Sequence, residues 1–319
     1  MNTFNSTIFS KTILSLGVLL RMAGFFLIMQ ASGELLLLQL VHIPSDFATH
    51  PEKLALIPNI QLILAGVQGA AMLIGFIALP LLYLKYFKSS ETPTNIFQSV
   101  PKQTWLLLAS AILLLASLPL AEQFALLNKN MSLPDLFKST EELMNQKEKT
   151  AAVLTDILVH YTNPFSFLFV FVVMSIIPAI GEELVFRGIL QKEWIKIGDN
   201  KHFAIWAGGF VFSFIHFQFF GFIPRMLLGV LFGYCYLWTN SLWVPITMHF
   251  INNALTLVIS AFFKESLLNA SQQENIVFDI VFFIPYIVAQ AVFLFLYYKF
   301  VRRQQMKVEV EVVCTEIKL

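Results

Sequence analysis

The chain has 319 residues, of which 57% are hydrophobic and only 13% are charged. A soluble domain carries about 25% charged residues, so this composition indicates an integral membrane protein that crosses the bilayer several times. The formal net charge of +1 gives no reason to expect a nucleic-acid partner, and the two cysteines, Cys235 and Cys314, form neither a disulfide framework nor a metal-binding spacing.

Apolar segments follow one another along the chain and predict an all-α fold, a polytopic bundle of about eight transmembrane helices. The expected spans are residues 13–41, 60–87, 105–127, 165–194, 203–220, 222–238, 242–263 and 276–300. Arg21 and Glu34 interrupt the first span, which is therefore expected to pack against other helices, with an Arg21 that reaches toward the interface as the alternative.

The segment 128–150 differs in composition, because it holds four lysines and four acidic residues. Pro134 suits the first turn of a surface helix with a weak apolar face, and an ordinary solvated loop is the alternative. This break divides the chain into a three-span region with its connector (1–160), a second membrane region (161–300) and a tail (301–319). The alternating residues 308–319 predict that the tail is strand-like or disordered.

Basic residues predict the orientation. If the N-terminus is cytoplasmic, most lysines and arginines of the loops fall on the cytoplasmic side, as the positive-inside rule requires. They are Lys11, Lys85, Lys88, Lys102, Lys192, Lys196, Lys201, Lys299, Arg302, Arg303 and Lys307. Both termini are therefore expected in the cytoplasm, although the four lysines of 128–150 lie on the other side.

Three expected spans carry polar clusters, which is costly in a membrane unless the groups are paired or hydrated. The clusters are Glu182-Glu183 with Arg187, Phe212 with His216, and His249 with Asn253. Counted from the inferred cytoplasmic ends, Glu182 lies about 18 Å deep and His216 about 20 Å deep, while His249 and Asn253 lie about 10 and 16 Å deep. Polar groups from three segments at similar depth predict one buried site.

Helical spacing divides the roles within this site. Glu183 precedes Arg187 by four residues, the favourable order for an intrahelical ion pair, so these two are expected to support the site structurally. Glu182 points about 100° away and has no local cation, which suits a general base. His249 and Asn253 share a face and could donate to an oxyanion, and Phe212 would form a wall beside His216.

Two ways of activating water remain open. Glu182 and His216 could position and deprotonate a water directly. Alternatively, Glu182, His216 and His249 could hold a divalent metal such as Zn²⁺, because zinc ligands need not be close in sequence. Gly-x-Ser-x-Gly and His-Glu-x-x-His motifs are absent from the sequence. Taken singly, a buried histidine or a Glu–Arg pair is more often structural, so the hypothesis depends on the whole set.

At these residues the chain resembles the family of CAAX proteases and bacteriocin-processing enzymes, also called the CPBP or Abi family, which includes the Ras-converting CAAX endoproteases. The family motifs Glu-Glu-x-x-x-Arg, Phe-x-x-x-His and His-x-x-x-Asn stand here in order within residues 181–253. The resemblance implies an intramembrane protease, metallo- or glutamate-dependent, with its catalytic domain in 161–300. Glu182 would be the base, His216 its partner in holding water, and His249 and Asn253 the oxyanion donors.

The resemblance also bears on substrates and on the alternatives. It implies an endopeptidase acting on membrane-associated or lipidated, CAAX-like peptides, in the inner or cell membrane if the source is bacterial. A non-catalytic bacteriocin-immunity or membrane scaffold protein is the alternative. A transporter that uses Glu182 and the histidines as a relay is a third hypothesis, which the lack of an internal repeat in the sequence disfavours.

Overall fold

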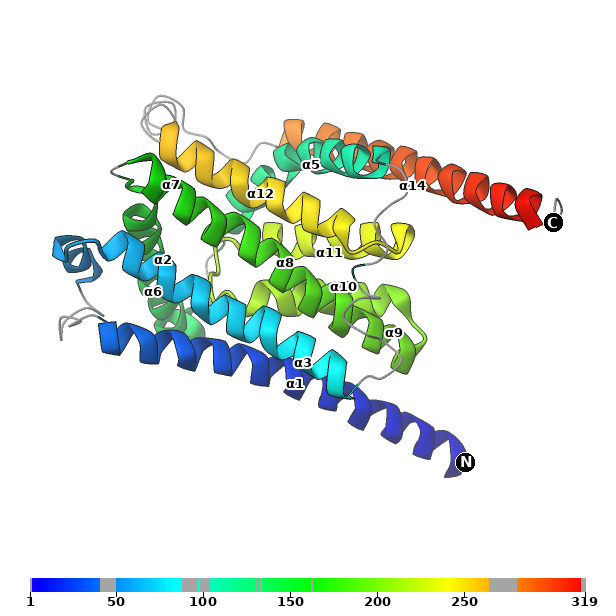
Figure 1. The fold of residues 1–319 in the computed structure, drawn as a ribbon, viewed down its shortest axis with the longest axis horizontal. Helices are drawn as coiled ribbons and strands as arrows, with labels where there is room; N and C mark the ends of the chain where they lie inside the picture. The colour runs from blue at the N-terminus through cyan, green and yellow to red at the C-terminus, as the bar shows by residue number, and fades with distance from the viewer. Residues whose placement is uncertain are drawn as a thin grey trace.

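A computed structural model describes residues 2–40, 50–87, 97, 104–129, 131, 134–161, 163–263 and 280–316. Within these residues the fold is all-α, as predicted, and no strand is present (Figure 1). The α-helices are α1 (Asn2–Leu40), α2 (Ile60–Met72), α3 (Leu79–Phe87), α5 (Trp105–Lys129), α6 (Lys138–Val159), α7 (Pro164–Phe171), α8 (Ile177–Glu183), α9 (Lys192–Gly198), α10 (Lys201–Phe214), α11 (Phe222–Thr239), α12 (Trp243–Phe262) and α14 (Ile280–Glu316). Two 3₁₀ turns, η1 (Pro51–Leu56) and η3 (Asp135–Phe137), and three π-helical segments, η2 (Leu73–Ala78), η4 (Val172–Ile176) and η5 (Leu184–Gln191), complete the set.

Seven helices of the described part of the chain are long and apolar enough to cross a membrane. They correspond to the expected spans except for 203–220, where α10 has only 14 residues and ends at Phe214. Phe217 has a φ of 51°, a left-handed conformation that a helix does not continue through. The aromatic run after Phe214 is apolar enough to suggest a full span, but its backbone turns back, so that α10 and α11 form a short helical hairpin with residues 215–221 at its tip.

Both ends of the described chain lie at the same end of the bundle, beside α9 and the start of α10 (Figure 1). Termini at the same end require the chain to pass through the bundle an even number of times, which holds when the short helix α10 is counted as one passage. Which side of the membrane that end faces stays a prediction. Because α10 runs away from α9, the tip of the α10–α11 hairpin lies away from the termini.

The longest span, Pro164–Gly198, is one continuous helical path through α7, η4, α8, η5 and α9. Pro178 at the start of α8 has no N–H to donate, so one helical hydrogen bond is missing there, and the π-helical η4 lies directly before it. A second π-helical segment, η5, follows Glu183. Such segments are frequent at functional sites, and here they flank the acidic pair.

The N-terminal spans pack directly on the helix that carries the acidic pair. One apolar cluster joins Val18 of α1 and Phe76 of η2 to Leu184 of η5 and to residues of α9 to α12. Gly181 permits this contact, because a Cβ there would lie 2.9 Å from the Cβ of Phe76. Since lipid is as apolar as these side chains, close van der Waals packing is what holds such helices together.

The sequence also predicted the conformation of two segments outside the spans, the polar connector and the C-terminal tail. The surface helix predicted in the polar connector is confirmed as α6, which follows Pro134 and η3. The prediction for the tail is wrong, because α14 continues as a helix to Glu316. An existing helix gains one hydrogen bond for each residue added, whereas a lone strand would have no neighbour to pair with.

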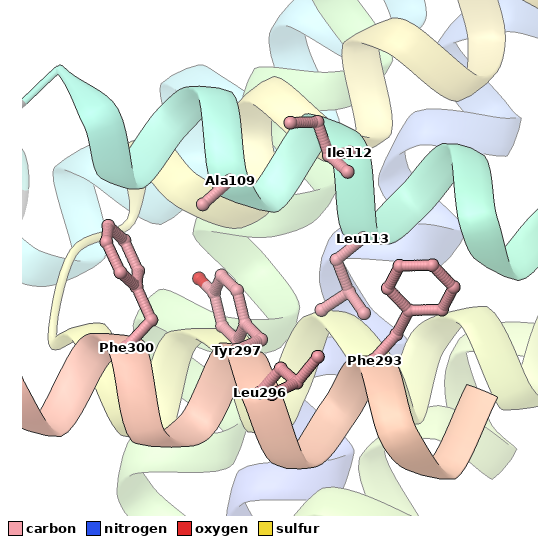
Figure 2. Close-up of a pocket in the computed structure, with 7 residues that line it drawn as sticks. All are labelled: Ala109, Ile112, Leu113, Phe293, Leu296, Tyr297 and Phe300. Atoms are coloured by element: carbon pink, nitrogen blue, oxygen red, sulfur yellow. The ribbon is translucent and has the colours of Figure 1, made fainter. Parts of the chain in front are cut away.

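A cavity of about 200 Å³ lies between α5 and α14, lined by Leu113, Phe293, Tyr297 and other apolar side chains (Figure 2). The hydroxyl of Tyr297 lies 2.7 Å from that of Ser110, so its polar end is satisfied within this helix pair. None of the three polar motifs contributes to this cavity.

Candidate functional site

Glu183 is the centre of the buried polar cluster. Its side chain is fully buried, and its Oε1 accepts hydrogen bonds from Arg187 Nη1 and from His249 Nδ1, both at 2.7 Å. The expected Glu183–Arg187 pair is therefore present, and it extends to α12. Because Glu183 and His249 are 66 residues apart, this bond joins two separate spans.

Arg187 is held on every side. Its Nη2 donates to the carbonyl of Gly229 on α11 at 2.9 Å, and its guanidinium carbon lies 5.0 Å from the ring centre of Phe212 and 5.6 Å from that of Phe232. Gly229 can come this close because α10 offers Gly209 opposite it, only 3.2 Å from where a Cβ of residue 229 would lie. Arg187 thus fixes η5 to α11.

Glu182 lies beside this network without joining it through a hydrogen bond. It is 7% exposed, and its Oε2 lies 3.8 Å from His249 Nε2. That oxygen is buried and has no hydrogen-bond partner among the described residues. Buried polar atoms without partners are rare in native proteins, and they frequently mark a place where water or a substrate binds.

His249 is oriented by its two acidic neighbours. Because Glu183 is the acceptor, Nδ1 of His249 carries the hydrogen, and Nε2 faces Glu182. Nε2 can then act as an acceptor in the neutral ring or as a donor in the imidazolium form.

His216 lies just beyond the end of α10. Its Nδ1 donates to the carbonyl of Phe212 at 2.8 Å, which leaves Nε2 as an acceptor in the neutral ring. The distance between ring centres is 5.2 Å from Phe212 to His216 and 5.8 Å from Phe212 to His249. Phe212 therefore separates and supports the two histidines, in agreement with its expected place as a wall.

Asn253 makes fewer contacts with the buried polar cluster than the other residues of the three motifs. It is one turn beyond His249 on α12 and half-buried, and its Oδ1 accepts from Asn252 Nδ2 at 3.5 Å. The structure therefore brings together Glu182, Glu183, Arg187, Phe212 and His249, with His216 adjacent, whereas the polar contact of Asn253 is with its neighbour.

The alternative site, in which Glu182, His216 and His249 would hold a divalent metal, does not form among the described residues. Among the residues that the structure describes, no group of three or more His, Cys, Asp or Glu side chains could hold a metal ion. The hydrogen bonds at Nδ1 leave Nε2 of both histidines as a potential ligand atom, but of the two Glu182 approaches only His249. The residues therefore do not fit the three-ligand set of Glu182, His216 and His249.

One charged residue near the site was missed by the sequence analysis. Arg225, in the first turn of α11, donates to the side chain of Gln218, which lies two residues after His216. The signal that could have found it is the one that found the others, an ionisable residue inside an apolar segment.

Comparison with known proteins agrees with the motifs. Residues 164–255 match the family model described as type II CAAX prenyl endopeptidase, Rce1-like. The resemblance expected from the motifs is confirmed over this segment, which contains all three of them. The match supports a protease role within the membrane.

Two curated proteins are similar to parts of the chain. The membrane-embedded CAAX protease MroQ of Staphylococcus aureus (strain USA300) is 34% identical over 124 residues, which cover 37% of this chain and 49% of that protein. The uncharacterized protein YpbD of Bacillus subtilis (strain 168) is 33% identical over 86 residues, which cover 26% of this chain and 41% of that protein. The chain therefore spans less than half the length of each relative. No solved structure matches the chain.

Proposed function

We propose that the protein is an intramembrane endopeptidase in which Glu182 activates the attacking water. The observation that carries the proposal is the arrangement of Glu182 and Glu183 around His249. Oε1 of Glu183 accepts from both Arg187 and His249, whereas no hydrogen bond joins Glu182 to either of them. Oε2 of each carboxylate is buried without a partner among the described residues, and that of Glu182 lies 3.8 Å from His249 Nε2. A buried base beside a polarised imidazole is suited to hydrolysis.

The reaction needs only groups already described. Glu182 takes one proton from water, and the oxygen of the resulting hydroxide attacks the carbonyl carbon of the peptide bond. His216 Nε2 accepts a hydrogen bond from the O–H that remains. His249 in its imidazolium form donates from Nε2 to the developing oxyanion, and Asn253 donates from its amide N–H. The tetrahedral intermediate then collapses, the C–N bond breaks, and Glu182 gives its proton to the leaving amine.

The proposed substrates are membrane-associated or lipidated, CAAX-like peptides. The support is the family match to residues 164–255 and the placement of the polar groups inside a bundle of spans. A peptide must therefore reach these groups from the membrane or its surface. A lipid anchor would supply that location at a free-energy gain of about 0.8 kcal/mol for each buried CH₂ group.

The test uses the whole chain reconstituted in lipid vesicles. A library of peptides, each prepared with and without a prenyl group on a cysteine near its C-terminus, is incubated with wild type and with Glu182→Gln. Mass spectrometry of the new termini should reveal cleavage by wild type alone, with faster cleavage of the prenylated members. If neither protein cleaves any peptide while Glu182→Gln keeps its cellular role, the non-catalytic immunity or scaffold function replaces the protease.

A further inference from the structure

Arg225 is a site cation that none of the three motifs uses. Its Nη2 donates to the side-chain oxygen of Gln218 at 2.6 Å, within the tip of the α10–α11 hairpin. Its Nη1 is buried and has no hydrogen-bond partner in the part of the chain that the structure describes. Of the two arginines near the site, Arg187 is therefore saturated and Arg225 has a donor to spare.

Two hydrogen bonds locate this spare donor. Gln218, which accepts from Arg225, lies two residues after His216, and Arg225 lies one helical turn before Gly229, whose carbonyl accepts from Arg187. No ion pair joins Arg225 to Glu182 or to Glu148 of α6 among the described residues, and Glu148 Oε2, like Glu182 Oε2, is buried without a hydrogen-bond partner. Burial raises the pKa of Glu148, and the charge of Arg225 acts in the opposite direction. Buried atoms of both signs are thus left without hydrogen-bond partners among the described residues: Nη1 of Arg225 and Oε2 of Glu148, Glu182 and Glu183.

The oxyanion donors expected from the sequence include no permanently charged group. His249 keeps Nε2 while its Nδ1 is bound to Glu183, and Asn253, which accepts from Asn252 only through Oδ1, offers a neutral amide N–H. An arginine is charged at all physiological pH values, and a hydrogen bond from a charged donor is about twice as strong as a neutral one. A fixed cation in a site of low polarity is the kind of group that stabilises charge appearing during a reaction.

We propose that Arg225 is a catalytic residue that donates from Nη1 to the carbonyl oxygen of the scissile bond as this oxygen becomes negatively charged. The inference rests on the proposed function. Gln218 holds the guanidinium by its other nitrogen and so leaves Nη1 available. Gly221 provides the space, because a Cβ at that position would lie 3.0 Å from Arg225 Nη2 and 3.6 Å from Nη1.

The test compares kcat and KM of Arg225→Gln, Arg225→Lys and Gly221→Ala with wild type, on a cleaved peptide made with a free C-terminal carboxylate and with an amide. Arg225→Gln should lower kcat by about 10²–10³-fold on both peptides with little change in KM, as loss of one oxyanion donor does. Arg225→Lys should recover part of the rate. Gly221→Ala should lower kcat by a smaller factor, because the added methyl group displaces only the guanidinium end of the flexible Arg225 side chain.

Two matched controls accompany these variants. Gly208→Ala lies on α10, where an added Cβ meets nothing within 4 Å, and Arg21→Gln removes an exposed arginine of α1 that lies over Tyr83. Both should keep the wild-type kcat. If Arg225→Gln does not fold, the kcat values of Arg225→Lys and Gly221→Ala can still be compared with that of wild type.

Three results would overturn the inference. An unchanged kcat in Arg225→Gln, with Glu182→Gln inactive, leaves the protease intact and removes Arg225 from the reaction. A loss confined to the free-carboxylate peptide and to KM makes Arg225 an anchor for the substrate terminus instead. If wild type cleaves no peptide at all, the proposed function itself fails, and the role of Arg225 falls with it.

Discussion

The two adjacent glutamates should respond in opposite ways to the loss of their charge. Glu183→Gln keeps the size of the side chain but removes the charge that faces Arg187 and His249, each bonded to it at 2.7 Å. Breaking a buried ion pair by removing one partner costs about 3–5 kcal/mol. Since a protein is stable by only about 5–15 kcal/mol, this is a large fraction of the free energy of unfolding.

Glu182→Gln removes a charge from an oxygen that has no hydrogen-bond partner among the described residues. Its effect on the free energy of unfolding should stay within about 1 kcal/mol. The rate should nevertheless fall by about 10²–10⁴-fold, the usual contribution of a general base. Stability and rate are thus expected to separate at two neighbouring positions.

The assay measures unfolding of purified protein in detergent as a function of added denaturing detergent, followed by tryptophan fluorescence, together with peptide cleavage at saturating substrate. Glu34→Gln on α1 is the matched control, because it removes an exposed carboxylate of a span. The reasoning is refuted if Glu183→Gln is as stable as wild type, or if Glu182→Gln is the variant that unfolds early.

Three further predictions concern metal, packing and topology. Treatment with a strong chelator should leave cleavage unchanged, because the described residues form no three-ligand group; loss of activity that Zn²⁺ restores would contradict this. Gly75→Ala should lower the free energy of unfolding by about 1–3 kcal/mol, since its Cβ would lie 2.3 Å from the Cβ of Met29, while Gly208→Ala should not. Cysteines at Lys147 on α6 and Arg303 on α14 should react with an impermeant reagent from opposite sides of the membrane; labelling from the same side would show that the bundle is threaded differently (Figure 1).

The local part of the site could be predicted from the sequence. The pairing of Glu183 with Arg187 follows from a spacing of four residues on one helix, and the structure contains it at 2.7 Å. The surface helix α6 followed from the position of Pro134 and a weak apolar face. In both cases the relevant interactions join residues that are close in sequence, and helix geometry alone determines which of them are in contact.

The non-local part could not be predicted in the same way. His249 was expected to act together with Asn253 on its own helix, but its hydrogen bond goes to Glu183, 66 residues away. The meeting depends on how α8 and α12 pack, and no spacing within either motif encodes that packing. The length of α10 was overestimated because hydropathy reports composition, whereas the turn at Phe217 depends on a backbone angle.

The hydrogen bonds divide this buried cluster into a satisfied half and an unsatisfied half. Oε1 of Glu183 accepts from Arg187 and from His249 Nδ1, and Arg187 also donates to the Gly229 carbonyl, so these bonds hold α8, η5, α11 and α12 together. In contrast, Oε2 of Glu182, Oε2 of Glu183 and Nη1 of Arg225 are buried without partners among the residues that the structure describes. Each such atom costs about 1–3 kcal/mol while it stays unpaired, a cost that bound water or a peptide carbonyl can remove. The satisfied half therefore supplies rigidity, and the unsatisfied half supplies the driving force for binding a polar group beside the base.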